Sequence, residues 1–175
     1  MLIHRIFETL KNKLWAVQWE GELAHVLRIL QDNWSDIIWL QDFFEGHKAD
    51  LQSGFYGRIT VDEAVDTTYD ESYELFEALE EDEGANLDNL FRPLNDREYQ
   101  IKDYQKQKAK GSERKTWLRI YAVKFADGYV ITGGAIKLTK TMQEREHTDL
   151  ELTKMSIVRD ALKLNTASDK FIDLE

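Results

Sequence analysis

The clearest pattern of apolar and polar residues lies between Trp117 and Thr141. Most of its first nine residues have β-branched, aromatic or other apolar side chains, which suit a pleated, half-buried surface. An Ala-Asp-Gly turn follows at 126–128, and Asp-Gly tolerates the positive φ values of a tight hairpin. The extended pattern then resumes, and Gly133 and Gly134 within it indicate a bulge or a close backbone approach. The stretch therefore predicts consecutive strands of one sheet.

Before this sheet, apolar residues mostly recur at helical spacing. The spacing predicts helices over four segments, which are 4–14, 22–31, 36–50 and 60–83. Thr60 and Glu63 form a capping box at the start of the last one, and Gly84 suits its end. The composition of LWAVQWE, residues 14–20, favours a short strand instead.

The segments on either side of the sheet are more polar. We expect a turn-rich connector over 86–95, a first strand over 99–104 and an exposed basic loop over 105–114. After the sheet, a second capping box at Thr148 and Glu151 predicts a helix to about Leu164.

These elements predict an α+β protein. A helical N-terminal portion, residues 1–85, packs with a small antiparallel sheet and a C-terminal helix that occupy residues 86–175. The two portions are either separate units or one compact domain, because 175 residues suffice for a single core.

Composition excludes several classes of chemistry. The chain has no cysteine, so disulfides, thiol catalysis and Cys-ligated metals are excluded. Its four histidines are scattered without the spacing of a zinc site, so we expect no metal and no other cofactor. There is no secretory signal pattern, and no apolar run approaches the roughly 20 residues that cross a bilayer. We therefore expect a cytoplasmic protein that has no membrane partner.

The net charge of −10 is distributed unevenly. Residues 1–95 contain 7 Lys and Arg against 20 Asp and Glu, whereas residues 96–163 contain 15 against 10. A basic segment can bind phosphate, and an acidic one repels nucleic acid. The predicted sheet thus lies in the only half of the chain whose charge suits an anionic partner.

From Leu90 onward, the order of elements resembles the C-terminal part of the RelE/HigB-like toxins of bacterial toxin–antitoxin pairs. The resemblance covers roughly residues 87–164 and consists of a connector, a strand pair, a Lys-Thr-rich loop and a Glu-containing helix. The matching residues are Phe91, Pro93 and Leu94; Trp117, Arg119, Ile120 and Tyr121; Lys137, Thr139, Lys140 and Thr141; and Thr148, Glu151 and Ala161.

The resemblance implies a metal-independent mRNA endonuclease, acting on free or ribosome-bound mRNA, whose protein partner is a cognate helix-turn-helix antitoxin. In such enzymes the 2′-OH of the RNA attacks the adjacent phosphate. Arg119 would clamp the phosphate, and Lys137 and Lys140 would add positive charge. Tyr121 or His147 would handle protons, and Arg145 would lie near the scissile bond.

Other functions fit the same residues. Arg119 is also compatible with a surface arginine paired to a nearby acid, and His147 with a local hydrogen-bonding role. The helix over 60–83 places four acids, Asp62, Asp66, Asp70 and Glu74, on one face at intervals of four residues. A non-catalytic protein could use this acidic helix as its contact surface, or the helix could shield the basic sheet of its own chain.

Overall fold

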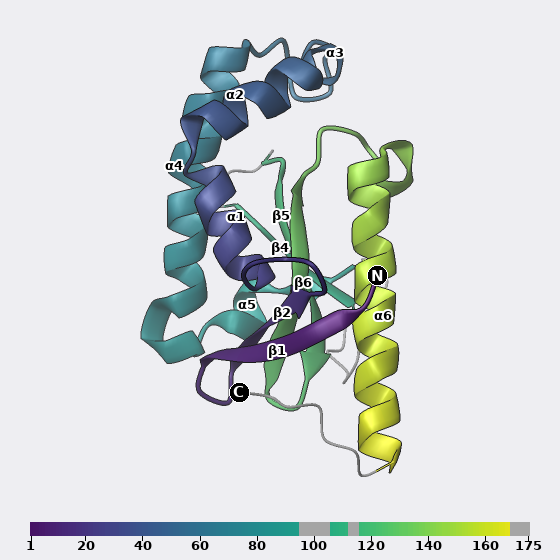
Figure 1. Cartoon of the computed structure of the whole chain (residues 1–175). Coiled ribbons are helices and arrows are strands. Elements are labelled where there is room, and N and C mark those ends of the chain that lie inside the picture. Colours follow the sequence, from purple (N-terminus) through teal and green to yellow (C-terminus); the bar gives the residue numbers. More distant parts are fainter. Residues whose placement is uncertain (95–105, 112–115, 169–175) are drawn as a thin grey trace.

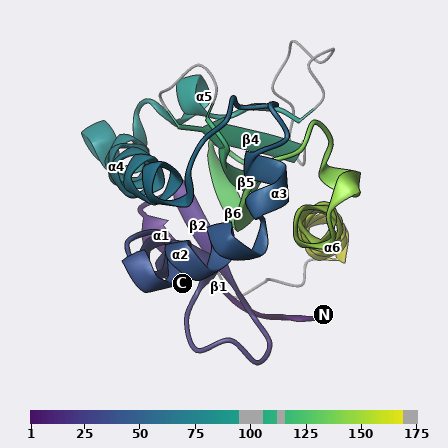
Figure 2. The same cartoon turned by 90° about the horizontal axis from the view of Figure 1, so that it is seen from above.

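The structure is a computed structural model that describes residues 1–94, 106–111 and 116–168, with side chains up to Lys163. It confirms an α+β protein: a mixed sheet with helices on both of its faces (Figures 1 and 2). Within the described residues, no helix is both long enough and apolar enough to cross a membrane.

The sheet contains strands from both ends of the chain. Its strands are β1 (Ile3–Leu10), β2 (Leu14–Trp19), β3 (Arg92–Pro93), β4 (Lys106–Lys110), β5 (Leu118–Phe125) and β6 (Gly128–Ile136). Their order is β1-β2-β6-β5-β4-β3, and every neighbouring pair is antiparallel except β2 and β6, which are parallel. The sheet predicted as small and antiparallel is thus larger and has one parallel pair, because the N-terminal hairpin joins it through β2.

The helices form two layers. They are α1 (Val26–Trp34), α2 (Ile37–Gly46), α3 (Lys48–Leu51), α4 (Val61–Glu80), α5 (Leu87–Leu90) and α6 (Glu146–Ser168), with 3₁₀ turns η1 (Glu81–Gly84) and η2 (Met142–Glu144). Helices α1, α2 and α4 lie on one side of the sheet, and α6 lies on the other (Figures 1 and 2). A core cluster of buried residues from β1 to α6 runs through both layers.

Gly133 and Gly134 permit the two layers to approach β6 closely. A Cβ atom on Gly133 would overlap the Glu151 carboxylate of α6, and one on Gly134 would lie 2.7 Å from the Leu30 Cδ1 atom of α1. The predicted close approach is confirmed. The bulge lies beside the glycines, because Tyr121 pairs with Gly133 and Ala122 with Ile131.

The N-terminal helix predicted over 4–14 is wrong, since residues 3–10 form β1. Ile6 pairs with Val17 of β2 and is fully buried. Asn12, with a φ of 60°, makes the turn between the two strands. Cross-strand pairing with β2 has overridden an apolar spacing that suited either structure.

The predicted helices at 22–31 and 60–83 are present with shifted ends, whereas the one predicted over 36–50 is divided at His47 into α2 and α3. Leu23 is fully exposed and lies before α1, which begins at Val26. Asp36 caps α2 by accepting the Ile38 N–H at 3.0 Å. Thr60 caps α4 as predicted and accepts the Glu63 N–H at 3.2 Å.

Two predictions near the sheet are wrong. Lys106–Lys110 lie in β4, with Gln107 and Ala109 fully buried, and do not form an exposed loop. The second capping box joins Thr141 to Glu144, and Thr148 lies inside α6. The strand expected over 99–104 falls outside the described residues.

Candidate functional site

A hollow of about 290 Å³ opens between β4, β5, the segment after β6 and α6. Five cationic residues line it together with Tyr121, and these are Lys108, Lys110, Arg119, Lys137 and Lys140. No lining residue among those described is acidic. The wall is therefore suited to an anion.

Strand register explains why these residues meet. Lys110 pairs with Arg119 across β4 and β5, and Lys108 pairs with Tyr121. Side chains of paired residues lie on the same face, and so do side chains two residues apart on one strand. Lys137 follows β6 directly, where its N–H donates to the Trp117 carbonyl at 2.8 Å. Lys108 and Lys110 thus line the site because residues 106–110 form a strand.

Arg119 is held by backbone carbonyls and not by an acid. Its Nη1 atom donates to the carbonyl oxygens of Thr116 at 2.7 Å and Leu118 at 2.9 Å, and the residue is 8% exposed. Within the described ranges no carboxylate forms an ion pair with it. The alternative of a surface arginine paired to a nearby acid is not what the structure contains. A fixed, uncompensated guanidinium favours an anionic ligand.

Lys137 is the second cation of this wall. Its Nζ atom donates to the Lys140 carbonyl oxygen at 2.8 Å. Burial lowers the pKa of Lys137, and so do the charges of Arg119 and of the β4 lysines. Glu144, whose charge raises the pKa of Lys137, accepts the N–H of Thr141 at 2.7 Å in the capping box. A lysine with a lowered pKa can bind an anion when charged and accept a proton when neutral.

Tyr121 is the one phenol in the described lining of the hollow. The residue is 1% exposed, and its hydroxyl has no hydrogen-bond partner in the part of the chain that the structure describes. Burial raises the pKa of Tyr121 far above its ordinary value, so the hydroxyl keeps its proton at neutral pH. An unpartnered buried donor is costly, and a bound oxygen atom would satisfy it.

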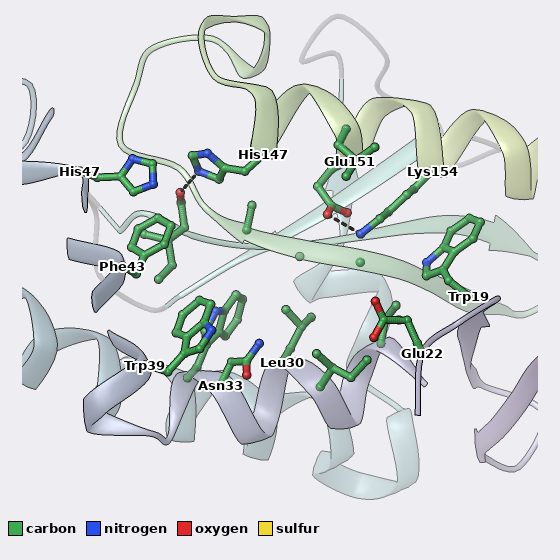
Figure 3. Close-up of a pocket in the computed structure, with 18 residues that line it drawn as sticks. Trp19, Glu22, Leu30, Asn33, Trp39, Phe43, His47, His147, Glu151 and Lys154 are labelled. Carbon is green, nitrogen blue, oxygen red and sulfur yellow. Dashed lines mark hydrogen bonds and ion pairs between the residues drawn. The ribbon is translucent and has the colours of Figure 1, made fainter. Parts of the chain in front are cut away.

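The other two predicted residues lie elsewhere. Arg145 forms a two-pronged ion pair with Asp50, in which Nη2 and Nε lie 2.6 Å and 3.0 Å from the two carboxylate oxygens. The Nε2 atom of His147 lies 3.0 Å from the Ile136 carbonyl oxygen, in a second hollow (Figure 3). Four of the six predicted residues therefore meet in one site, and Arg145 and His147 do not.

Sequence reasoning missed Asp50, the partner of Arg145, and placed Lys108 and Lys110 in a loop where the structure has a strand. Asp50 is 95 residues from Arg145 in the chain, so no local pattern links them. Lys108 and Lys110 have a detectable signal, because Lys106, Lys108 and Lys110 alternate with Gln107 and Ala109 at the period of a strand. Within the described residues, no group of His, Asp or Glu is placed to hold a metal ion.

Comparisons with known proteins do not assign a family. A scan against protein-family models, a search of curated proteins and a search of solved structures all find no match to this chain. The RelE/HigB-like resemblance of residues 87–164 stays a prediction.

Proposed function

We propose that the chain is the toxin component of a toxin–antitoxin pair and cleaves mRNA without a metal ion. The observation that supports this function most is the hollow in which Arg119, Lys137 and Lys140 gather, with no acidic residue among the described residues of its wall. RNA offers a phosphate every nucleotide, and positive charge in a concave wall binds such groups.

Each residue of the hollow has a role in the proposed reaction. Arg119 and Lys140 hold the non-bridging oxygens of the scissile phosphate and stabilise the charge that develops on them. Lys137, in its uncharged form, accepts the proton of the 2′-OH as the new bond from the 2′-oxygen to phosphorus forms. Tyr121 donates its proton to the 5′-oxygen as the old phosphorus–oxygen bond breaks. The products are a 2′,3′-cyclic phosphate and a 5′-hydroxyl.

In this proposal the partner is a cognate helix-turn-helix antitoxin that covers the hollow, and the substrate is mRNA, free or on the ribosome. His147 and Arg145 take no part in the step. The His147 ring is bonded to the Ile136 carbonyl, and the Arg145 charge is already paired with Asp50.

A second candidate is a non-catalytic protein that binds a basic partner through α4. Four acids of α4 are exposed as predicted, and these are Asp62, Asp66, Asp70 and Glu74. Tyr69 and Tyr73 add exposed aromatic surface, at 45% and 65% exposure. Such a complex should dissociate as ionic strength rises. The idea that α4 shields the basic residues fails, because no α4 residue lines the hollow and α4 and α6 lie on opposite sides of the sheet.

The test incubates the full chain with labelled single-stranded RNA in the presence of a metal chelator. A cell-free translation assay follows. The proposal predicts cleavage to 2′,3′-cyclic phosphate ends and a block of translation. Lys137→Arg keeps the charge but removes the base, so RNA binding should persist while cleavage is lost. Lys11→Ala, at an exposed lysine outside the hollow, serves as control. Intact RNA and normal translation at high protein concentration would reject the enzyme.

A further inference from the structure

A second hollow, of about 420 Å³, lies along the edge of β6 (Figure 3). Leu30 of α1 and Trp39 of α2 line one side, and Glu151 and Lys154 of α6 line the other. Trp19 closes one end, and the two histidines, His47 and His147, lie at the opposite end (Figure 3). The hollow shares no lining residue with the basic one, so a ligand bound in it does not depend on the proposed nuclease.

The hollow lies beyond the point where the pairing between β2 and β6 ends. The parallel pairing of β2 with β6 ends at Ile131, and β6 continues to Ile136. The N–H of Lys137 points toward the β5 side and donates a hydrogen bond to the carbonyl oxygen of Trp117, the residue before β5. Backbone groups alternate in direction along a strand, so those of Thr132, Gly134 and Ile136 point away from β5.

Side chains cap two of these three outward positions. The Trp19 Nε1–H donates to the Thr132 carbonyl oxygen at 3.0 Å. The His147 Nε2 atom lies 3.0 Å from the Ile136 carbonyl oxygen, and a carbonyl only accepts, so this nitrogen donates. The N–H and C=O of Gly134 remain between the two caps. No described strand pairs with them on that side.

This arrangement selects the shape of a ligand. An extended peptide adds to a sheet edge by forming hydrogen bonds over several residues. Here the carbonyls of Thr132 and Ile136 already accept hydrogen bonds from side chains, so such a peptide does not fit. A compact ligand with one donor beside one acceptor matches the Gly134 N–H and C=O. A volume of about 420 Å³ is within the usual range for small-molecule sites.

Aromatic rings and charge define the ligand further. Trp39 and Phe43 stack with centroids 5.7 Å apart and an interplanar angle of 13°, and both line the hollow. Flat rings of this kind favour a flat, aromatic partner. The charged residues of the wall are two carboxylates, Glu22 and Glu151, and one ammonium, Lys154, which disfavours a phosphate group.

Glu151 provides a second, independent sign of a ligand. It is 4% exposed, and its Oε1 atom accepts from the Lys154 Nζ at 2.8 Å. Its Oε2 atom is buried and has no hydrogen-bond partner in the described residues. The same atom lies over the Cα of Gly133, next to the Gly134 edge. An unsatisfied carboxyl oxygen at this place can accept a hydrogen bond from an incoming molecule when Glu151 is ionised and donate one when it is protonated.

We propose that this hollow binds a planar nucleobase, free or as a nucleoside, whose donor–acceptor edge bonds the backbone of Gly134. Its ring packs against the aromatic rings of α2, and Glu151 bonds a further N–H or amino group of the base. The base comes from a free nucleoside or from an unstacked residue of RNA.

The test is a calorimetric titration of the full chain with adenosine, guanosine, cytidine and uridine, followed also by tryptophan fluorescence. We expect at least one nucleoside to bind with a Kd below about 1 mM, the weak limit for a small specific ligand. Ile29→Trp fills the hollow from its half-buried wall and should weaken binding at least tenfold, as should Trp39→Ala. Tyr73→Ala, which lines neither hollow, should leave it unchanged.

The outcomes separate this inference from the nuclease. Ile29→Trp should leave RNA cleavage intact, because Ile29 does not line the basic hollow. Competition by a trinucleotide would identify RNA as the source of the base, and absence of competition would identify a free nucleoside. The inference is overturned if no nucleoside binds below 1 mM, if binding survives both substitutions in protein with unchanged melting temperature, or if a monophosphate binds far more tightly than its nucleoside.

Discussion

Arg119 and Lys137 lie on the same side of the β5–β6 ladder. Burial is the larger cause of the lowered pKa of Lys137, and the charge of Arg119 is the next. Arg119 pairs with Ala135, two residues before Lys137. Neither cation forms an ion pair in the ranges that the structure describes. Two like charges kept close and unneutralised are unfavourable for folding alone, and they become favourable when an anion binds.

Arg119→Lys separates the geometry of the clamp from its charge. Lysine keeps the positive charge but loses the planar fork that bonds two phosphate oxygens. We expect the affinity for single-stranded RNA to fall about tenfold, the equivalent of one strong hydrogen bond. Fluorescence anisotropy with a labelled oligoribonucleotide measures this change, and thermal denaturation confirms that the variant is folded. Equal affinities of the variant and the wild type would remove Arg119 from the site.

Tyr121→Phe should stabilise the protein while it impairs function. The substitution removes a buried hydroxyl that has no hydrogen-bond partner in the described structure, and relief of such a group is worth about 1 kcal/mol. Urea denaturation measures the gain in unfolding free energy, and RNA cleavage measures the loss of the proton donor. A loss of stability would show that the hydroxyl is bonded in the folded protein and is not held ready for a ligand.

Glu151 makes stability depend on pH near neutrality. Burial raises the pKa of Glu151 to about 7, from an ordinary value of 4.5. The folded state therefore keeps a proton that the unfolded state has lost, and stability falls as pH rises from about 4.5 to 7. From the size of this shift, the fall is on the order of 3 kcal/mol.

Glu151→Gln should abolish this fall, because the amide does not titrate. Unfolding free energies at pH 5 and pH 8 measure the difference, and Glu77→Gln at an exposed position of α4 is the matched control. If the wild type and Glu151→Gln change in parallel between these two pH values, Glu151 is not buried as the structure has it.

Gly133→Ala tests the contact between β6 and α6. A Cβ atom at this position overlaps the Glu151 carboxylate, so the variant should lose about 1–3 kcal/mol of stability, as overpacked cores do. Removing the carboxylate in the double variant Gly133→Ala, Glu151→Ala should recover much of the loss that Gly133→Ala causes. Simple additivity of the two single changes would place Glu151 away from the strand.

The sequence predicts the elements that depend on local chemistry. Strand β5, the Asp-Gly turn, the α4 cap at Thr60 and the close approach at Gly133 follow from composition, φ preferences and side-chain size. The exposed acids of α4 follow from their spacing. These features need no knowledge of distant residues.

Features that depend on distant pairing are not predictable in this way. Residues 3–10 become β1 only because β2 lies beside them, and β2 is fixed by a parallel pairing with β6 more than a hundred residues later. Likewise, the grouping of Arg119 with Lys137 follows from the register of β5 and β6. Arg145 lies outside the basic hollow, where it forms an ion pair with Asp50. The free edge at Gly134 exists because the pairing of β2 with β6 ends at Ala16 and Ile131, although β2 itself continues to Trp19.

The most direct test of the basic hollow is the salt dependence of its affinity for single-stranded RNA. Each phosphate contact on a single strand contributes about −0.7 to the slope of log affinity against log salt. Five cationic residues line the hollow, so the slope for the wild type should be no steeper than about −3.5, and Lys140→Ala should make it shallower by about 0.7 while Lys11→Ala leaves it unchanged. A wild type that does not bind RNA at low salt, or a slope that Lys140→Ala and Lys11→Ala affect equally, would contradict the assignment of this hollow to phosphate.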